Sequence, residues 1–254
     1  MSRSDPIRAR YYDAVELADK ASDWLFYIGA ALSIVTLLVE REAHPTVYEW
    51  LLIFFAIAVV ALFAIGIASR LYLTPRAEDK RRQDFFSSAC GVSLTHDKTD
   101  GYYNNDFTEP IKRMAAQVLE NSHFSKAIAL RMAKVERAKV IAYALIWLVC
   151  LLNRQTDLGI VVAASQAVFS EQVISRWLRL EWLRMRFEKT YEDVYRLFQS
   201  KPIASKFNAM TLESLGMYET AKANGAITLS SRVFNEMNDA LSIEWDRIKA
   251  ELQI

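Results

Sequence analysis

The sequence predicts an all-α integral membrane protein, with four transmembrane helices in two hairpins plus a helical cytoplasmic domain. The first observation is that uncharged stretches alternate with densely charged ones, in a chain of 254 residues that is 52% hydrophobic and 24% charged. The second is that no segment shows the convincing alternation of apolar and polar residues that is typical of a β-strand. This pattern indicates helices in lipid that are joined to helices in water.

The first two apolar segments, residues 24–39 and 50–69, contain no charged residue. The second has the roughly 20 residues needed to cross a bilayer core of about 30 Å. The first is slightly shorter, but Glu40 can lie at the membrane interface. Aromatic side chains, which favour that interface, fall near the span ends at Trp24, Tyr27, Tyr48 and Trp50. We therefore predict a transmembrane hairpin over residues 23–73.

A third and a fourth apolar segment, residues 140–152 and 158–170, are also uncharged. At 1.5 Å per residue each reaches only about 20 Å, which is less than the bilayer core. Lys139 and Arg176 can extend them by reaching outward to the headgroups. We predict a second hairpin over residues 139–175, and the alternative is that both segments are buried core helices of a soluble domain.

Lysine and arginine residues near the span ends are concentrated on one side of the predicted spans. The other side holds only Arg41 and Arg154. Cytoplasmic loops carry an excess of Lys and Arg. This bias places residues 1–22, the connection 74–138 and the tail 176–254 in the cytoplasm, so that both termini of a multi-pass protein lie inside the cell.

The charged parts of the chain carry helix signals, namely apolar residues every three or four positions, a proline in a first turn, and serine caps. The Gly-, Asn- and Asp-rich residues 91–107 predict an irregular connection. We expect helices over residues 76–88 and 109–139, a continuation of span four as far as Pro202, a helix over residues 212–223, and two more that begin at Ser230 or Ser231 and at Ser242.

Recognisable catalytic and metal-binding motifs are missing from the sequence. The three histidines are far apart without metal-ligand spacing, and neither a phosphate-binding glycine loop nor a nucleophile elbow occurs. Cys90 and Cys150 cannot form a zinc site unaided. We therefore expect no enzyme activity, metal or cofactor, and the net charge of +1 argues against DNA or RNA as a partner.

The run Gly101-Tyr-Tyr-Asn-Asn suggests a ligand site, because tyrosine stacks on nucleobases and asparagine pairs with base edges. Asn121 is a weak helix former inside a predicted helix, and nearby arginines can bind phosphates. The alternative is a tight turn with its tyrosines packed on helices, and arginines that face water or headgroups. The candidate ligand residues are Tyr102, Tyr103, Asn104, Asn105, Asn121, Lys126, Arg81 and Arg82.

Three polar residues, Gln166, Glu171 and Gln172, lie in or beside the fourth apolar segment. Polar groups within a membrane usually face the interior of a helix bundle or a water path. We predict that these side chains face a pore or the interior of the bundle.

Three stretches carry a family resemblance: GYYNN at 101–105, ENSHFSK at 120–126, and the tail at 218–245. In this order around two hydrophobic hairpins, they resemble the SMODS-associated four-transmembrane effectors of bacterial cyclic-oligonucleotide anti-phage signalling (CBASS), over almost the whole chain. The resemblance implies that the cytoplasmic domain binds a cyclic di- or trinucleotide. The spans then disrupt the inner membrane and cause abortive infection. We carry over no ligand-residue pattern from that family.

We expect a homo-oligomer in the lipid bilayer, since one four-helix unit leaves little room for a pore. Two other functions remain compatible with the sequence. A constitutive ion channel would conduct without nucleotide input, and a membrane-anchored scaffold would recruit a partner through its tail.

Overall fold

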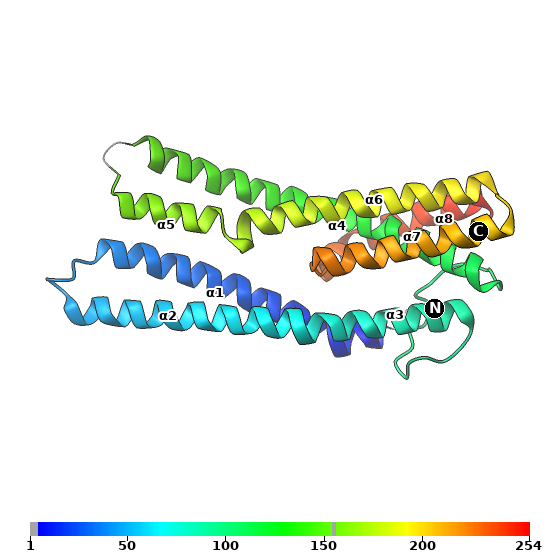
Figure 1. The fold of residues 1–254 in the computed structure, drawn as a ribbon, viewed down its shortest axis with the longest axis horizontal. Helices are drawn as coiled ribbons and strands as arrows, with labels where there is room; N and C mark the ends of the chain where they lie inside the picture. The colour runs from blue at the N-terminus through cyan, green and yellow to red at the C-terminus, as the bar shows by residue number, and fades with distance from the viewer. Residues whose placement is uncertain (1–4, 154–155) are drawn as a thin grey trace. The chain divides into compact units, whose positions relative to one another are not determined.

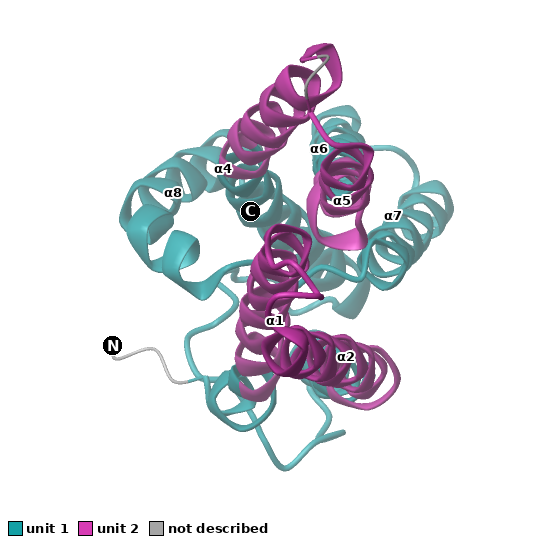
Figure 2. Cartoon of the chain, turned by 90° about the vertical axis from the view of Figure 1, so that its left-hand side faces the viewer, with its two compact units in different colours: residues 1–13, 74–133, 179–254 teal, residues 14–73, 134–178 magenta. Residues whose placement is uncertain are grey.

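The computed structural model describes residues 5–153 and 156–254, and the regular elements of this part of the chain are helices (Figure 1). It forms two compact units (Figure 2). Unit 1 comprises residues 1–13, 74–133 and 179–254, and unit 2 comprises residues 14–73 and 134–178. Residues 1–4 and Arg154, one of the two basic residues used for the predicted orientation, lie outside the described residues. The all-helical prediction is confirmed.

Unit 2 begins with two helices that lie side by side, α1 (Asp13–Leu38) and α2 (Pro45–Ala68) (Figure 1). A π-helical turn, Arg8–Tyr12, leads into α1 without a break. Pro45 occupies the first turn of α2, where its missing N–H has no cost. A second π-helical turn, Ser69–Leu73, connects α2 with the next helix.

Three helical stretches in the described part of the chain are long and apolar enough to cross a membrane: Arg8–Leu38, Pro45–Cys90 and Leu158–Ser200. In the most apolar stretches of the first two only 6% of the residues are buried, and in the third 11%. Monomeric soluble proteins rarely expose apolar surface of this extent. The protein therefore has the character of a membrane protein.

The third apolar segment is the end of a long helix, α4 (Pro110–Leu152), and does not itself meet the length and composition of a span. The fourth is α5 (Leu158–Val168), in which Asp157 caps the first turn by accepting a 2.7 Å hydrogen bond from the Gly159 N–H. Trp147 Nε1 donates a 2.8 Å hydrogen bond to Ser165 Oγ and so joins α4 to α5.

The fourth segment continues into a charged helix, as predicted, but with an irregularity at residues 169–175. Helix α5 ends at Val168, and a π-helical turn, Glu171–Ser175, precedes α6 (Arg176–Ser200). The hydroxyl of Ser170 bonds back to the carbonyl of Ala167 at 2.7 Å. Serine side chains compete in this way with the helical hydrogen bonds of the backbone.

Unit 1 packs α3 (Thr74–Cys90), α7 (Ala204–Gly225), α8 (Ser231–Leu252), the first part of α4 and most of α6 around one hydrophobic core. The predicted apolar face of α6 is confirmed, although Tyr191 is only half-buried. The buried members of that face are Leu180, Leu183, Phe187, Val194 and Phe198.

The predicted boundaries of the last two helices need correction. Helix α7 begins at Ala204 instead of residue 212. A single helix, α8, replaces the two expected after residue 230, because one buried face continues past Ser242 from Leu241 to Trp245. Ser230 does cap α8, since its Oγ accepts a 3.4 Å hydrogen bond from the Val233 N–H.

Candidate functional site

The segment between α3 and α4 is irregular, as expected, and buried carboxylates of both helices hold its middle part. Asp84 of α3 accepts hydrogen bonds from the backbone N–H and the hydroxyl of Thr99, at 3.1 and 2.6 Å. Glu120 of α4 accepts one from the Asn104 N–H at 3.1 Å. Gly101 has a positive φ of 62°, which glycine adopts without strain. The Tyr-Tyr-Asn-Asn run is therefore held in place on both helices.

Three of the predicted ligand residues meet at this segment. The Arg81 Cζ lies 4.5 Å from the centroid of the Tyr102 ring, which is a cation–π contact. The Tyr102 and Tyr103 rings meet edge to face with centroids 4.9 Å apart. Tyr103 packs in the same manner on Phe85 of the core, at 5.9 Å. These contacts fix the orientation of both tyrosines.

The guanidinium of Arg81 is largely buried, with 14% of its side chain exposed. Its Nη2 lies 2.7 Å from Asp5 Oδ2, and its Cζ lies 5.5 Å from the centroid of the Tyr12 ring. Its buried Nη1 makes no hydrogen bond within the described residues. Because arginine is always charged and carries five donors, this nitrogen can still bind an anionic oxygen.

Two residues of the segment, Tyr103 and Asn105, also carry unsatisfied polar groups. Within the part of the chain that the structure describes, the buried Tyr103 hydroxyl and both side-chain atoms of the Asn105 amide make no hydrogen bond. Burial raises the pKa of Tyr103 well above its usual value, so its hydroxyl remains a donor. Each such unsatisfied group costs about 1–3 kcal/mol, which a ligand or an ordered water would recover.

A largely buried ion-pair network adjoins these residues, and no motif in the sequence pointed to the lysine at its centre. Lys222 of α7 lies 2.6 Å from Glu78 Oε2 and 3.2 Å from Glu219 Oε1. Tyr12 donates a 2.8 Å hydrogen bond to Glu78 Oε1. Burial alone would lower the pKa of Lys222, but the two carboxylates outweigh it and raise that pKa well above its usual value. Lys222 is therefore a permanent cation.

The remaining predicted ligand residues are not part of this cluster. Arg82 forms an ion pair with Asp79 on the exposed side of α3. Lys126 contacts a different neighbour, with its Nζ 3.1 Å from the centroid of the Tyr191 ring, and burial lowers its pKa. Asn121 is half-buried in α4, and the side chain of Asn104 is exposed.

The three polar residues of the predicted pore differ in exposure. In the single chain Gln166 and Glu171 are exposed, and Gln172 is half-buried. Gln166 and Glu171 could face the interior of a helix bundle only if several chains assembled. Their placement in a pore stays a prediction.

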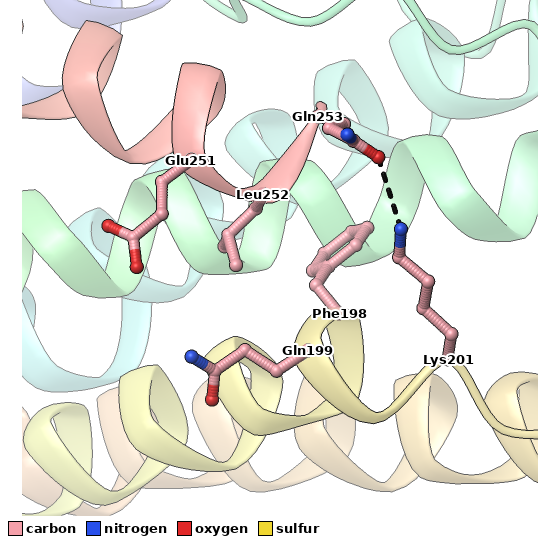
Figure 3. A pocket seen from close by; sticks show the side chains of 6 residues that line it. All are labelled: Phe198, Gln199, Lys201, Glu251, Leu252 and Gln253. Carbon is pink, nitrogen blue, oxygen red and sulfur yellow. Dashed lines mark hydrogen bonds between the residues drawn. The ribbon is translucent and has the colours of Figure 1, made fainter.

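A shallow pocket of about 360 Å³ lies at the C-terminal ends of α6 and α8 (Figure 3). None of the predicted ligand residues lines it, and Lys201 Nζ there donates to Gln253 Oε1 at 3.1 Å. Its lining residues are Phe198, Gln199, Lys201, Glu251, Leu252 and Gln253. With its cation engaged by a neighbouring amide, this pocket is a weaker candidate than the cluster around Arg81.

The fold and the site define an all-helical protein with membrane-like helices and a helical unit that contains a buried polar cluster. Among the described residues, no group of three His, Cys, Asp or Glu is arranged to hold a metal ion. Comparisons with family models, with curated proteins and with solved structures found no match for this chain.

Proposed function

We propose that this protein is a membrane effector of bacterial anti-phage defence, which binds a cyclic di- or trinucleotide in unit 1 and then disrupts the inner membrane. The proposal includes four spans in two hairpins with both termini in the cytoplasm. The observation that carries it is the cluster of Arg81, Tyr102 and Tyr103, in which a buried guanidinium nitrogen and the Tyr103 hydroxyl make no hydrogen bond to any residue that the structure describes.

The cluster supplies the chemistry that a nucleotide requires. The guanidinium of Arg81 pairs with a phosphate oxygen, and a tyrosine ring stacks on a base. The guanidinium of Arg81 lies over Tyr102, so a base that stacks on this face has to displace it. A ligand shifts a conformational equilibrium only by its different affinity for two states. Because binding displaces Arg81 from Tyr102 and from Asp5, the ligand has a different affinity for the two positions of the Arg81 side chain.

The membrane step rests on the exposed apolar helices of unit 2. Assembly of several chains encloses polar residues such as Gln166 and Glu171, which are exposed in one chain. The short third and fourth spans also favour local thinning of the bilayer.

Dye release from liposomes tests this proposal. Purified protein in vesicles of phosphatidylethanolamine and phosphatidylglycerol is challenged with a panel of cyclic di- and trinucleotides. We expect release with at least one of them. The Tyr102→Ala/Tyr103→Ala double variant and Arg81→Ala should need about tenfold more nucleotide or fail, since loss of a contact worth about 1.4 kcal/mol is tenfold in affinity.

The matched control is Arg196→Ala, which removes an exposed arginine that pairs with Glu192 at 3.4 Å. It should respond as the wild type does. Release without any nucleotide would instead support a constitutive channel. The absence of release with every nucleotide would reject the effector function and leave the membrane-anchored scaffold.

A further inference from the structure

The segment that precedes α1 is docked on α3. Ile7 is fully buried, and Asp5 Oδ1 caps the segment by accepting a 3.0 Å hydrogen bond from the Arg8 N–H. The other carboxylate oxygen of Asp5 lies 2.7 Å from Arg81 Nη2. The Tyr12 hydroxyl binds Glu78 at 2.8 Å. Residues 5–12 thus contact α3 through two polar links one helical turn apart.

A second set of contacts ties the same segment to the irregular connection after α3. Arg10 forms an ion pair with Asp97, whose other carboxylate oxygen accepts a 3.0 Å hydrogen bond from the Tyr11 hydroxyl. The Cζ of Arg76 lies 5.3 Å from the centroid of the Tyr11 ring. Asp97 is itself buried. The segment therefore contacts both elements that carry the cluster of Arg81, Tyr102 and Tyr103.

Arg81 is the residue that the first set of contacts shares with the candidate site. Its guanidinium covers Tyr102 and at the same time pairs with Asp5. The pairing of Arg81 with Asp5 also connects two elements that are continuous with the membrane helices α1 and α2. The docked segment runs directly into α1, and α3 follows directly from α2 through residues 69–73.

We infer that residues 5–12 form a latch, and that an anionic oxygen of the ligand releases it by replacing Asp5 on Arg81. This inference rests on the proposed function and specifies how the site is regulated. Asp5 and Tyr12 are positioning residues, since they act through Arg81 and Glu78. With the latch closed the N-terminal start of α1 is held on α3. Its release frees α1 to change its position in the bilayer.

The test compares the full-length double variant Asp5→Asn/Tyr12→Phe with the wild type. Both changes preserve size and remove one carboxylate charge and one hydroxyl. The matched control is Glu236→Gln/Tyr195→Phe, which removes an exposed carboxylate paired with Arg232 at 2.9 Å and a hydroxyl bonded to Glu251 at 2.6 Å. The readouts are dye release without nucleotide and amide hydrogen exchange of residues 8–13.

We expect the latch variant to release dye without nucleotide, or at about tenfold lower nucleotide concentration, and to exchange residues 8–13 about tenfold faster. The control variant should match the wild type in both. Nucleotide-dependent release by the wild type together with an unchanged latch variant would overturn the latch and keep the proposed function. Release by the latch variant without any response to nucleotide in the wild type would keep the latch and reject the nucleotide input. If neither protein releases dye, both are rejected.

Discussion

The guanidinium of Arg81 lies over the ring of Tyr102, with 4.5 Å between Cζ and the ring centroid. The arginine comes from α3 and the tyrosine from the irregular segment that follows it. This contact fixes the position of the arginine relative to the tyrosine ring in the candidate site.

A double-mutant cycle of Arg81→Met and Tyr102→Leu measures that contact. We expect a coupling free energy of about 0.5–2 kcal/mol, because the cation–π contact is partly desolvated. Thermal or denaturant unfolding in detergent provides the four stabilities. The pair Arg196→Met and Tyr102→Leu should couple by less than about 0.5 kcal/mol. A coupling of zero between Arg81 and Tyr102 would contradict the contact.

The topology of the third and fourth apolar segments can be decided by cysteine labelling. In a background of Cys90→Ser and Cys150→Ser, single cysteines at Glu42, Thr156 and Asp193 are treated with a membrane-impermeant maleimide in spheroplasts. Four spans predict labelling at positions 42 and 156 from outside, and labelling at 193 only after lysis. If α4 stops short of the far side, position 156 is protected and position 193 is labelled from outside.

His123 makes the stability of unit 1 depend on pH. It is 1% exposed, its Nε2 lies 3.3 Å from the Leu241 carbonyl, and its Nδ1 makes no hydrogen bond within the described residues. Burial lowers the pKa of His123, against the opposing effect of Glu244 at 3.8 Å. The unfolded chain, with a histidine pKa of about 6.5, therefore binds the proton more readily than the folded one.

The contribution of His123 to stability is therefore complete above about pH 6.5 and is lost as the pH falls below that value. Melting temperatures in detergent between pH 8 and pH 5 measure this loss. His123→Gln should flatten the dependence, whereas His96→Gln, which changes an exposed histidine, should leave it unchanged. Equal slopes for the wild type and His123→Gln would contradict the assignment.

Ser230 and Ser242, which were predicted to begin two separate helices, should differ in their effect on stability, because the structure has the single helix α8 there. Ser230→Ala removes the hydrogen bond to the Val233 N–H and should cost about 1 kcal/mol. Ser242 lies within α8, so Ser242→Ala should leave the free energy of unfolding unchanged or raise it slightly, since alanine has the higher helix propensity. Chemical unfolding of each variant measures the difference. Destabilisation by Ser242→Ala alone would instead indicate a helix that starts there.

Gly225 and Gly216 of α7 make a matched pair for a packing test. A Cβ at Gly225 would lie 3.1 and 3.2 Å from the terminal carbons of Leu183, which is 1% exposed in the core. Gly225→Ala should therefore lower stability by about 1 kcal/mol or more. No atom lies within 4 Å of a Cβ at Gly216, so Gly216→Ala should raise stability by up to about 1 kcal/mol. The decisive result is whether the two substitutions change the free energy of unfolding in opposite directions.

The sequence alone determined that this protein is helical and that its first two apolar segments are suited to lipid, although it did not determine all helix boundaries. These properties depend on signals that are local in the chain, such as the uncharged run 50–69, the three- and four-residue period in α6, and Pro110 at the start of α4. The irregular segment after α3 was equally predictable, because glycine and short polar residues disfavour regular structure there.

Only the tertiary structure decided which side chains meet. Arg81 pairs with Asp5, 76 positions away, and Tyr12 with Glu78, 66 positions away. No periodicity connects such residues. The tertiary structure also showed that Arg82, which is adjacent to Arg81 in sequence, faces outward. Neighbouring residues on a helix point about 100° apart. Lys222 is a buried cation since three elements close around it, and that closure depends on how the helices of unit 1 pack together.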